Sequence, residues 1–257
     1  MVRLEHIEKI FNKDSVNEVT LFQDFNLTIY EGEFISVVGS NGSGKTTTLN
    51  LICGSLPVDG GRIWLGEKDI THMPEYRRNA AIGRVFQDPA KGTCPSLTIL
   101  ENMSLADNKG KPYGLSRGVN RKRIDFYKSQ LELLHLGLEE KLDLQVGVLS
   151  GGQRQALALL IATLTPIDLL VLDEHTAALD PKSSENVMAL TDEIVKAKGL
   201  TAIMVTHNLR FAVEYGTRLL MMDKGHCVID SGPDGKEHYQ IDDLLKVFNE
   251  ISIECGN

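Results

Sequence analysis

The chain has 257 residues, 42% hydrophobic and 24% charged, which is enough for one large or two modest domains with an apolar core. Its net charge of −8 offers no basic field to nucleic acid, so we expect no nucleic-acid partner. The four cysteines form no CxxC pair, and neither a disulfide framework nor a zinc site is expected.

No apolar run approaches the roughly 18 residues that a membrane-spanning helix needs. The longest runs are Ala156–Leu164 and Leu169–Leu172. The segment Met1–His6 carries charges where a secretion signal has an apolar stretch. If the protein works at a membrane, we expect other chains to supply the spanning helices.

The first part of the chain predicts strands around a glycine-rich loop. A helix should follow this loop from Lys45 to about Gly54, before a cluster of turn residues. The run Phe34–Val38 is apolar on both faces and leads into the loop. The expected strands are Val2–Leu4, Leu27–Tyr30, Phe34–Val38 and Arg62–Leu65.

Residues 90–157 predict a mainly helical subdomain inserted into the strand-rich part. Helical patterns begin near Thr98 and Ile124, on either side of a polar, glycine-rich stretch from Asp107 to Gly118. The closing helix, Gln153–Leu164, is apolar nearly all round and should be buried.

Alternation of strands and helices returns after this subdomain. Apolar runs at Leu169–Leu172 and Ala202–Val205 suit central parallel strands. Leu219–Ile229 predicts a hairpin, and Ile241–Phe248 a short amphipathic helix. We therefore expect one domain over 1–257, with a core of 1–89 and 158–235, a helical subdomain of 90–157 and a tail of 236–257.

The glycine-rich loop fits the pattern GxxxxGK[ST], which binds nucleotide phosphates. Glycines let backbone N–H groups point inward at phosphate, and the following helix N-terminus favours the anion. Lys45 should reach the β- and γ-phosphates, and the Thr46 hydroxyl should bind Mg²⁺. The alternative is a chance glycine-rich turn. The predicted ATP-binding residues of the loop are Gly39, Ser40, Asn41, Gly42, Ser43, Gly44, Lys45, Thr46 and Thr47.

Two adjacent carboxylates follow the apolar strand at Leu169–Leu172. Asp173 is the candidate for holding Mg²⁺ through water, and Glu174 is the candidate general base that positions the attacking water. The alternative places both acids in the first turn of the next helix, where negative charge suits the helix dipole.

The segment Leu149–Gln153, with the sequence LSGGQ, lies between the phosphate loop and these carboxylates. This order of motifs resembles the ATP-binding subunit of an ABC (ATP-binding cassette) transporter, over about residues 2–230. The resemblance implies an α/β fold of the P-loop NTPase, ABC ATPase type. Its RecA-like core carries an antiparallel β-subdomain and an inserted helical subdomain.

The same resemblance assigns four further residues. Gln87 matches the glutamine of the Q-loop, which approaches Mg²⁺ and the water, and His207 matches the switch histidine at the γ-phosphate. Asp180 matches the D-loop, although it also suits a helix N-cap before Pro181. Phe11 is placed where an aromatic ring stacks on adenine, with Phe22 and Phe25 nearby as alternatives.

The resemblance also implies partners. Two such chains pair head to tail, so that Ser150, Gly151, Gly152 and Gln153 face the ATP of the other copy. ATP and Mg²⁺ are the implied cofactors. A transmembrane permease would insert a coupling helix beside the helical subdomain. An extracellular substrate-binding lipoprotein would deliver a solute, with amino acids as one class. The chain would then lie peripherally on the cytoplasmic face of the cell membrane.

Two places depart from the pattern. His175 follows Glu174 where many relatives have proline, and Ala156 and Ile161 replace two arginines. His175 either tunes Glu174 electrostatically or is a packing variant of a bacterial importer subgroup. The basic cluster Arg117 and Arg121–Arg123 either approaches anionic lipid or forms a solvated helix face.

Other functions within the resemblance differ in their partners. A soluble assembly ATPase, such as that of iron–sulfur cluster machinery, would work without a permease. An exporter would move solute outward. Translation and DNA-repair members predict two cassettes or a long coiled-coil insertion, and this sequence has neither.

Overall fold

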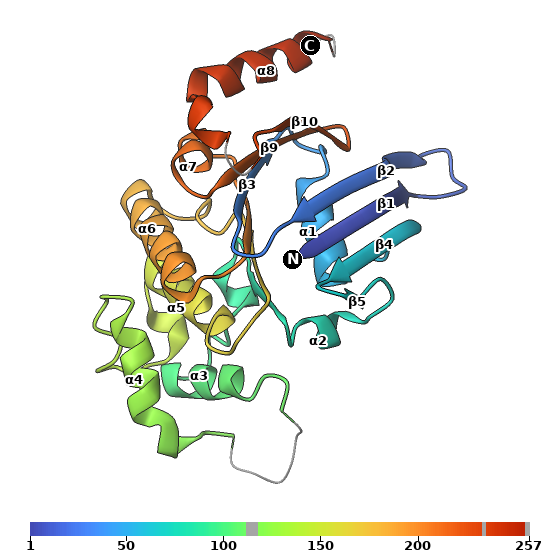
Figure 1. Cartoon of the computed structure of the whole chain (residues 1–257). Helices are drawn as coiled ribbons and strands as arrows, with labels where there is room; N and C mark the ends of the chain where they lie inside the picture. Colours follow the sequence, from blue (N-terminus) through green and yellow to red (C-terminus); the bar gives the residue numbers. More distant parts are fainter. Residues whose placement is uncertain (112–117, 233–234, 255–257) are drawn as a thin grey trace. The chain divides into compact units, whose positions relative to one another are not determined.

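The computed structural model describes residues 1–111, 118–232 and 235–254, and these residues form two compact units (Figure 1). The first unit is built from Met1–Asn79 and Lys198–Asn257, and the second from Ala80–Ala197. The second unit contains the whole of the predicted helical subdomain together with strands on either side of it. The boundaries at 90 and 157 stay a prediction.

An antiparallel sheet opens the first unit, with the strand order β2-β1-β4-β5. Strand β1 lies in the middle, where Val2 pairs with Ile29 on one side and Leu65 on the other. The strands are β1 (Val2–Phe11), β2 (Val19–Ile29), β4 (Gly60–Leu65) and β5 (Lys68–Asp69), followed by the short helix α2 (Glu75–Arg78).

Strands β1 and β2 are much longer than predicted. The prediction stopped short because two bulges interrupt the alternation of apolar and polar residues in these strands. His6 and Asp24 both have positive φ (52° and 64°), and the His6 ring bonds the Asp24 carboxylate at 2.6 Å. Register shifts follow at these positions. A bulge moves the next side chains to the opposite face, so the apolar period of two is lost beyond Leu4.

The parallel strands of the first unit surround β3 (Phe34–Gly39). It pairs with β8 (Ala202–Val205) on one side and with β9 (Arg218–Asp223) on the other. Every residue of β3 is buried, as its apolar composition predicts. β9 turns into the antiparallel β10 (His226–Asp230), which confirms the predicted hairpin.

Two helices pack on apolar residues of β3, β9 and β10. The helix α7 (Leu209–Glu214) and the C-terminal helix α8 (Ile241–Glu254) pack on a cluster that joins Val38 of β3 to Leu244 of α8. Phe248 of α8 packs against the same cluster. The C-terminal helix extends six residues beyond the predicted Phe248. The end of β3, where the phosphate loop begins, therefore rests on α8.

The second unit contains a parallel strand pair and several helices. Strand β6 (Ile82–Val85) pairs with β7 (Leu169–Asp173), and Arg84 lies opposite Val171. The helices are α3 (Ile99–Asp107), α4 (Ile124–Glu132), α5 (Gly151–Ala162) and α6 (Pro181–Lys198). The central residues of α5 are buried, as predicted.

Strand β6 and helix α7 were not predicted, and each has a local reason. In β6, Gly83 breaks the apolar run because α5 approaches closely: a Cβ atom at Gly83 would lie 2.5 Å from the carbonyl oxygen of Ala162. α7 has only six residues, which is too short for a periodic apolar pattern to stand out.

Candidate functional site

The phosphate loop runs from the end of β3 to α1 (Lys45–Cys53) and depends on two glycines. Gly39 and Gly44 have φ values of 150° and 107°. A Cβ atom would lie 2.1 Å from the carbonyl oxygen of Met222 at Gly39, and 2.8 Å from the Phe22 ring at Gly44. The loop is therefore pressed against β9 and β2, and only glycine fits at these two positions.

Lys45 stabilises the curl of this loop from inside. Its side chain is buried, and Nζ donates to the carbonyl oxygens of Gly39 and Ser40, each at 2.8 Å. The Ser40 hydroxyl donates to the Asp223 carboxylate at 2.8 Å, which ties the loop to the end of β9. The ammonium group thus lies inside a loop that opens onto the N-terminus of α1, a favourable place for phosphate.

His207 lies beside the same loop. A cavity of about 300 Å³ in the first unit is lined by Gly39, Ser40 and Asn41 from the loop, and by Thr206, His207 and Phe248, among others. The Thr206 hydroxyl accepts from the N–H of Asn208, and the Asn208 side chain caps α7. These bonds fix the backbone on the C-terminal side of His207. The structure therefore brings together the predicted phosphate loop and the predicted switch histidine.

Phe248 is a cavity residue that sequence reasoning missed. The amphipathic pattern of its helix was recognised, but a pattern does not say which surface a helix covers. The structure places Phe248 in the lining shared by the phosphate loop and His207. Only its position in the fold makes Phe248 part of the site, since its neighbours in the sequence carry no nucleotide-binding motif.

Three phenylalanines were candidates for stacking on adenine, and their surroundings differ. Phe22 and Phe25 are buried and stack on each other with ring centroids 4.6 Å apart. Phe11 ends β1, is partly exposed, and has Lys9 Nζ 5.6 Å from its ring centroid. Of the three, Phe11 therefore has the ring surface that a ligand can reach.

In the second unit, Asp173 is held by an arginine that sequence reasoning missed. Arg84 of β6 contacts the Asp173 carboxylate at 2.9 Å, and both side chains are nearly buried. The guanidinium also lies 4.7 Å from the centroid of the Phe86 ring, one residue before Gln87. A charged residue within a short apolar strand was the available signal, because a buried arginine needs a carboxylate.

Glu174 follows in a strained backbone conformation. Its φ is 48°, and its carbonyl oxygen accepts from the N–H of Ala177 at 2.9 Å. A non-glycine residue in this region costs roughly 1–3 kcal/mol and often marks a functional site. The next helix begins only at Pro181, so the alternative that both acids occupy its first turn is wrong.

His175 points into the interior rather than beside Glu174. It is 1% exposed, and its Nε2 lies 3.1 Å from the Thr191 hydroxyl. Thr191 donates its proton to the Val187 carbonyl, so it accepts from His175 Nε2–H. Burial lowers the pKa of His175 to about 4, and the ring is neutral at pH 7. These contacts agree with a packing role.

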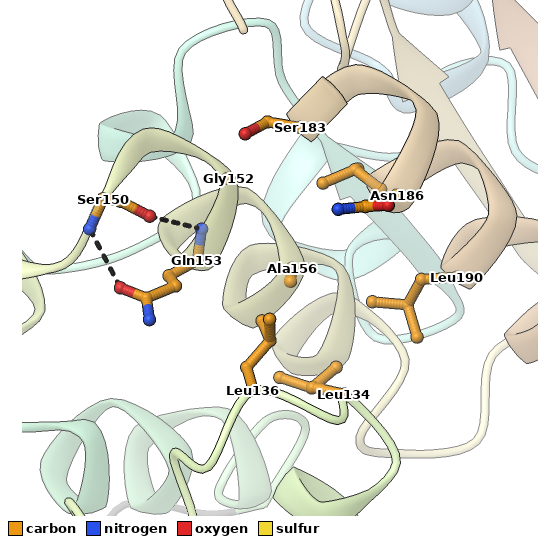
Figure 2. A pocket seen from close by; sticks show the side chains of 10 residues that line it. Leu134, Leu136, Ser150, Gly152, Gln153, Ala156, Ser183, Asn186 and Leu190 are labelled. Atoms are coloured by element: carbon orange, nitrogen blue, oxygen red, sulfur yellow. Dashed lines mark hydrogen bonds between the residues drawn. The ribbon is translucent and has the colours of Figure 1, made fainter. Parts of the chain in front are cut away.

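The LSGGQ segment begins helix α5 with a capping box. The Ser150 hydroxyl accepts from the N–H of Gln153 at 3.3 Å, and the Gln153 side chain accepts from the N–H of Ser150 at 3.1 Å (Figure 2). Gly151 and Gly152 form the first turn, where backbone N–H groups have no partner within the helix. The segment therefore presents donors to an outside acceptor.

Asp180 and Gln87 lie on either side of this helix in sequence. Asp180 accepts from the N–H of Ser183 at 3.1 Å and so begins α6, and hydrogen bonds from Ser183 lower its pKa. Gln87 is exposed after β6. The backbone just before it is anchored to α5, because the buried Gln155 side chain donates to the carbonyl oxygen of Phe86 at 3.0 Å.

The basic cluster is only partly solvated. Arg123 pairs with Asp107 at 3.0 Å and lies 4.2 Å from the Phe126 ring centroid. Arg117 lies outside the described residues. Arg121 and Lys122 are exposed, so both interpretations of the cluster, a lipid contact and a solvated helix face, stay predictions.

The predicted Mg²⁺ donors, Thr46 in the first unit and Gln87 and Asp173 in the second, have the chemistry that this ion prefers. Thr46, Gln87 and Asp173 offer a hydroxyl, an amide and a carboxylate oxygen, the hard ligands that Mg²⁺ prefers. No group of three or more acidic, histidine or cysteine side chains suited to a metal occurs in the described part of the chain. Phosphate oxygens of bound nucleotide would supply the remaining ligands.

Comparison with known proteins identifies the class. The ABC transporter family matches residues 22–177. The chain is 44% identical over 248 residues to the tyrosine transport ATP-binding protein of Clostridioides difficile (strain R20291), covering 96% of this chain and 98% of that protein. It is 34% identical to the spermidine/putrescine import ATP-binding protein PotA of Mannheimia succiniciproducens, covering 94% of this chain and 62% of that protein.

A solved structure of the ATP-binding cassette MJ0796, dimeric and bound to ADP and phosphate, is similar at a TM-score of 0.75. The two chains are 28% identical, and the likeness covers 90% of this chain and 97% of that one.

The chain therefore belongs to the ABC transporter family, as its ATP-binding subunit. The predicted fold class, a P-loop NTPase of the ABC ATPase type, is confirmed. Membership implies that the domain binds ATP and that hydrolysis accompanies transport. Among the residues that the structure describes, no helix has the length and apolar character to cross a membrane.

The Arg84–Asp173 pair predicts a stability effect. Arg84→Met leaves the Asp173 carboxylate nearly buried without its cation, so the free energy of unfolding should fall by about 3 kcal/mol. Adding Asp173→Asn removes the stranded charge and should recover most of that loss. Urea denaturation of the four proteins in a double-mutant cycle measures this, and simple additivity of the two losses would contradict the pair.

The pKa of His175 predicts acid sensitivity. Because the folded pKa, about 4, lies below the ordinary 6.5, the unfolded chain binds more protons between these values. The stabilisation is complete above pH 6.5 and is lost as pH falls toward 4. From pH 7 to pH 5, the wild type should lose about 2 kcal/mol more than His175→Gln. Equal losses in chemical denaturation would show that the folded protein does not keep His175 neutral.

Proposed function

We propose that this chain is the ATP-hydrolysing subunit that powers a bacterial ABC importer for a small solute, an amino acid in particular. The observation that carries the proposal is the cavity shared by the phosphate loop and His207, whose loop curl is stabilised by Lys45. The tyrosine transport and the spermidine/putrescine import relatives support transport rather than a soluble assembly function.

In this proposal, the residues of the chain divide the reaction among them. Lys45 and His207 hold the γ-phosphate, and the N–H groups of the loop stabilise its charge. Glu174 accepts a proton from the attacking water, whose oxygen bonds to the γ-phosphorus while the bond to ADP breaks. Bound Mg²⁺, held by Thr46, Gln87 and Asp173, would neutralise charge on the β- and γ-phosphates.

The ATP site is completed by a second copy of the chain. The backbone N–H groups of Gly151 and Gly152 in the first turn of α5, and the Ser150 hydroxyl, would face the γ-phosphate bound by the other copy. A helix N-terminus is suited to that anion. Asp180 would contact the partner across the interface, and Phe11 would stack on adenine. The similar cassette MJ0796, which is dimeric and bound to ADP and phosphate, supports pairing of two cassettes.

Outside the ATPase pair, we infer a transmembrane permease and an extracellular substrate-binding lipoprotein as partners. The chain would act at the cytoplasmic face of the membrane, with Gln87 linking the permease to the nucleotide. The anchoring of the backbone before Gln87 to α5 supports such a link, because movement at one is transmitted to the other.

The role of Glu174 as base predicts the behaviour of Glu174→Gln. This variant keeps the size and the positive-φ turn but cannot accept a proton, so the turnover of ATP should fall about 100-fold or more while ATP is still bound. Steady-state phosphate release and equilibrium ATP binding measure the two effects. Near wild-type turnover would remove Glu174 as the base.

Sharing of sites between chains predicts rescue by mixing. Lys45→Ala has no phosphate-loop lysine and Ser150→Arg has no usable signature, so each should be inactive alone. In their heterodimer, the loop of the Ser150→Arg chain meets the signature of the Lys45→Ala chain, which makes one intact site. Equal mixing should then recover roughly a quarter of wild-type hydrolysis, since about half the dimers are mixed and each has one of two sites.

A chain carrying both changes, mixed with each single variant, is the matched control and should recover no activity. Failure of the two single variants to complement each other would show that the signature does not act on the nucleotide of the other copy.

A further inference from the structure

Helices α5 and α6 begin in close contact within the second unit. A Cβ atom at Gly152 would lie 3.1 Å from Ser183 Cβ and 3.2 Å from Ser183 Oγ. One residue earlier, a Cβ atom at Gly151 would lie 3.3 Å from Leu179 Cδ2. Figure 2 shows Ser183 at the start of α6 and Gly152 in the first turn of α5. The two glycines of the signature therefore meet the segment around Asp180.

A cleft of about 260 Å³ lies next to this contact. Its lining includes Ala156 of α5, Val187 and Leu190 of α6, and Leu134 and Leu136. Figure 2 shows Ala156 and Leu190 on the two helices, with Leu134 and Leu136 below them. Apolar side chains line this cleft but do not fill it. Gly152 and Ser183 are thus a point of close approach between the first turns of the two helices.

Ser183 also belongs to a tightly bonded segment of its own. Its N–H donates to Asp180, and the hydroxyl of the next residue, Ser184, donates to the carbonyl oxygen of Thr176 at 2.9 Å. These bonds fold residues 176–180 onto the start of α6. Displacement of Ser183 would therefore displace Asp180 with it.

We propose that Ser183 is a positioning residue for the shared ATP site, acting through Gly152. Resting on the proposed function, this attributes the need for glycine at position 152 to contact with its own chain, while the N–H of Gly152 still faces the nucleotide of the other copy. The signature turn and the segment Leu179–Ser183 then form one mechanical unit. Bulk at Gly152 displaces the Ser150 hydroxyl and the N–H donors without touching ATP, and loss of bulk at Ser183 restores them.

The test measures ATP-dependent dimerisation of the full chain by analytical ultracentrifugation, with all variants in a Glu174→Gln background. Gly152→Ala should weaken ATP-dependent dimerisation about tenfold or more, because overpacking by one methyl shifts a helix turn. Ser183→Gly, added to Gly152→Ala, should restore dimerisation to within about threefold of the parent. Ser183→Ala removes only Oγ and should restore less. ATP affinity of the isolated chain should not change in any variant.

Two further variants separate packing from other effects. Gly92→Ala is the matched control, since its Cβ atom would meet Ala158 Cβ at an ordinary 3.6 Å, and it should dimerise normally. Ser183→Val adds bulk from the opposite helix and should weaken dimerisation as Gly152→Ala does. This variant also tests the contact if Gly152→Ala fails to fold.

The outcomes distinguish the two proposals. If Ser183→Gly does not rescue Gly152→Ala, or if Ser183→Val dimerises normally, Ser183 does not position the signature. Failure to rescue would then show that the nucleotide of the other copy, and not Ser183, needs the space beside Gly152. If the parent variant binds ATP but never dimerises, the shared-site function is overturned, and this inference with it.

Discussion

The backbone of the phosphate loop lies so close to β9 and β2 that no side chain fits at Gly39 or Gly44, and the rest of the nucleotide site depends on this approach. Pressed against Met222 and Phe22, the loop curls far enough for its own carbonyls to surround the Lys45 ammonium. The same curl brings Ser40 and Asn41 into one cavity with His207. A methyl group at either glycine would therefore disturb both the carbonyl contacts of Lys45 and the cavity shared with His207.

In the second unit, the signature turn likewise depends on close backbone packing. This is the turn that is proposed to bind the nucleotide of another chain. Gly152 leaves room for Ser183, so the positions of the signature turn and of the segment around Asp180 are fixed relative to each other. On the same unit, Arg84 holds Asp173, and Gln155 anchors the backbone before Gln87. Asp173, Gln87 and the signature turn thus each have a neighbour that fixes their place but carries no nucleotide chemistry.

Those neighbours mark the limit of sequence reasoning. The phosphate loop, the apolar strands before it and before Asp173, and the buried closing helix follow from local pattern, because spacing and composition decide them. Arg84, Ser183 and Phe248 could not be found that way, since their importance lies in contacts with distant parts of the chain. The bulges at His6 and Asp24 likewise hid most of β1 and β2 by breaking the alternation on which strand prediction rests.

Cross-linking can show whether the signature of one chain lies at the ATP of another. With the native cysteines replaced, one chain would carry Asn41→Cys in the phosphate loop and a second chain Ser150→Cys in the signature; both native side chains are exposed. A short bifunctional maleimide should join the two chains when ATP is present and hydrolysis is blocked by Glu174→Gln. No cross-link between chains under these conditions, or one formed equally well without ATP, would contradict the placement of the signature at the ATP of another chain.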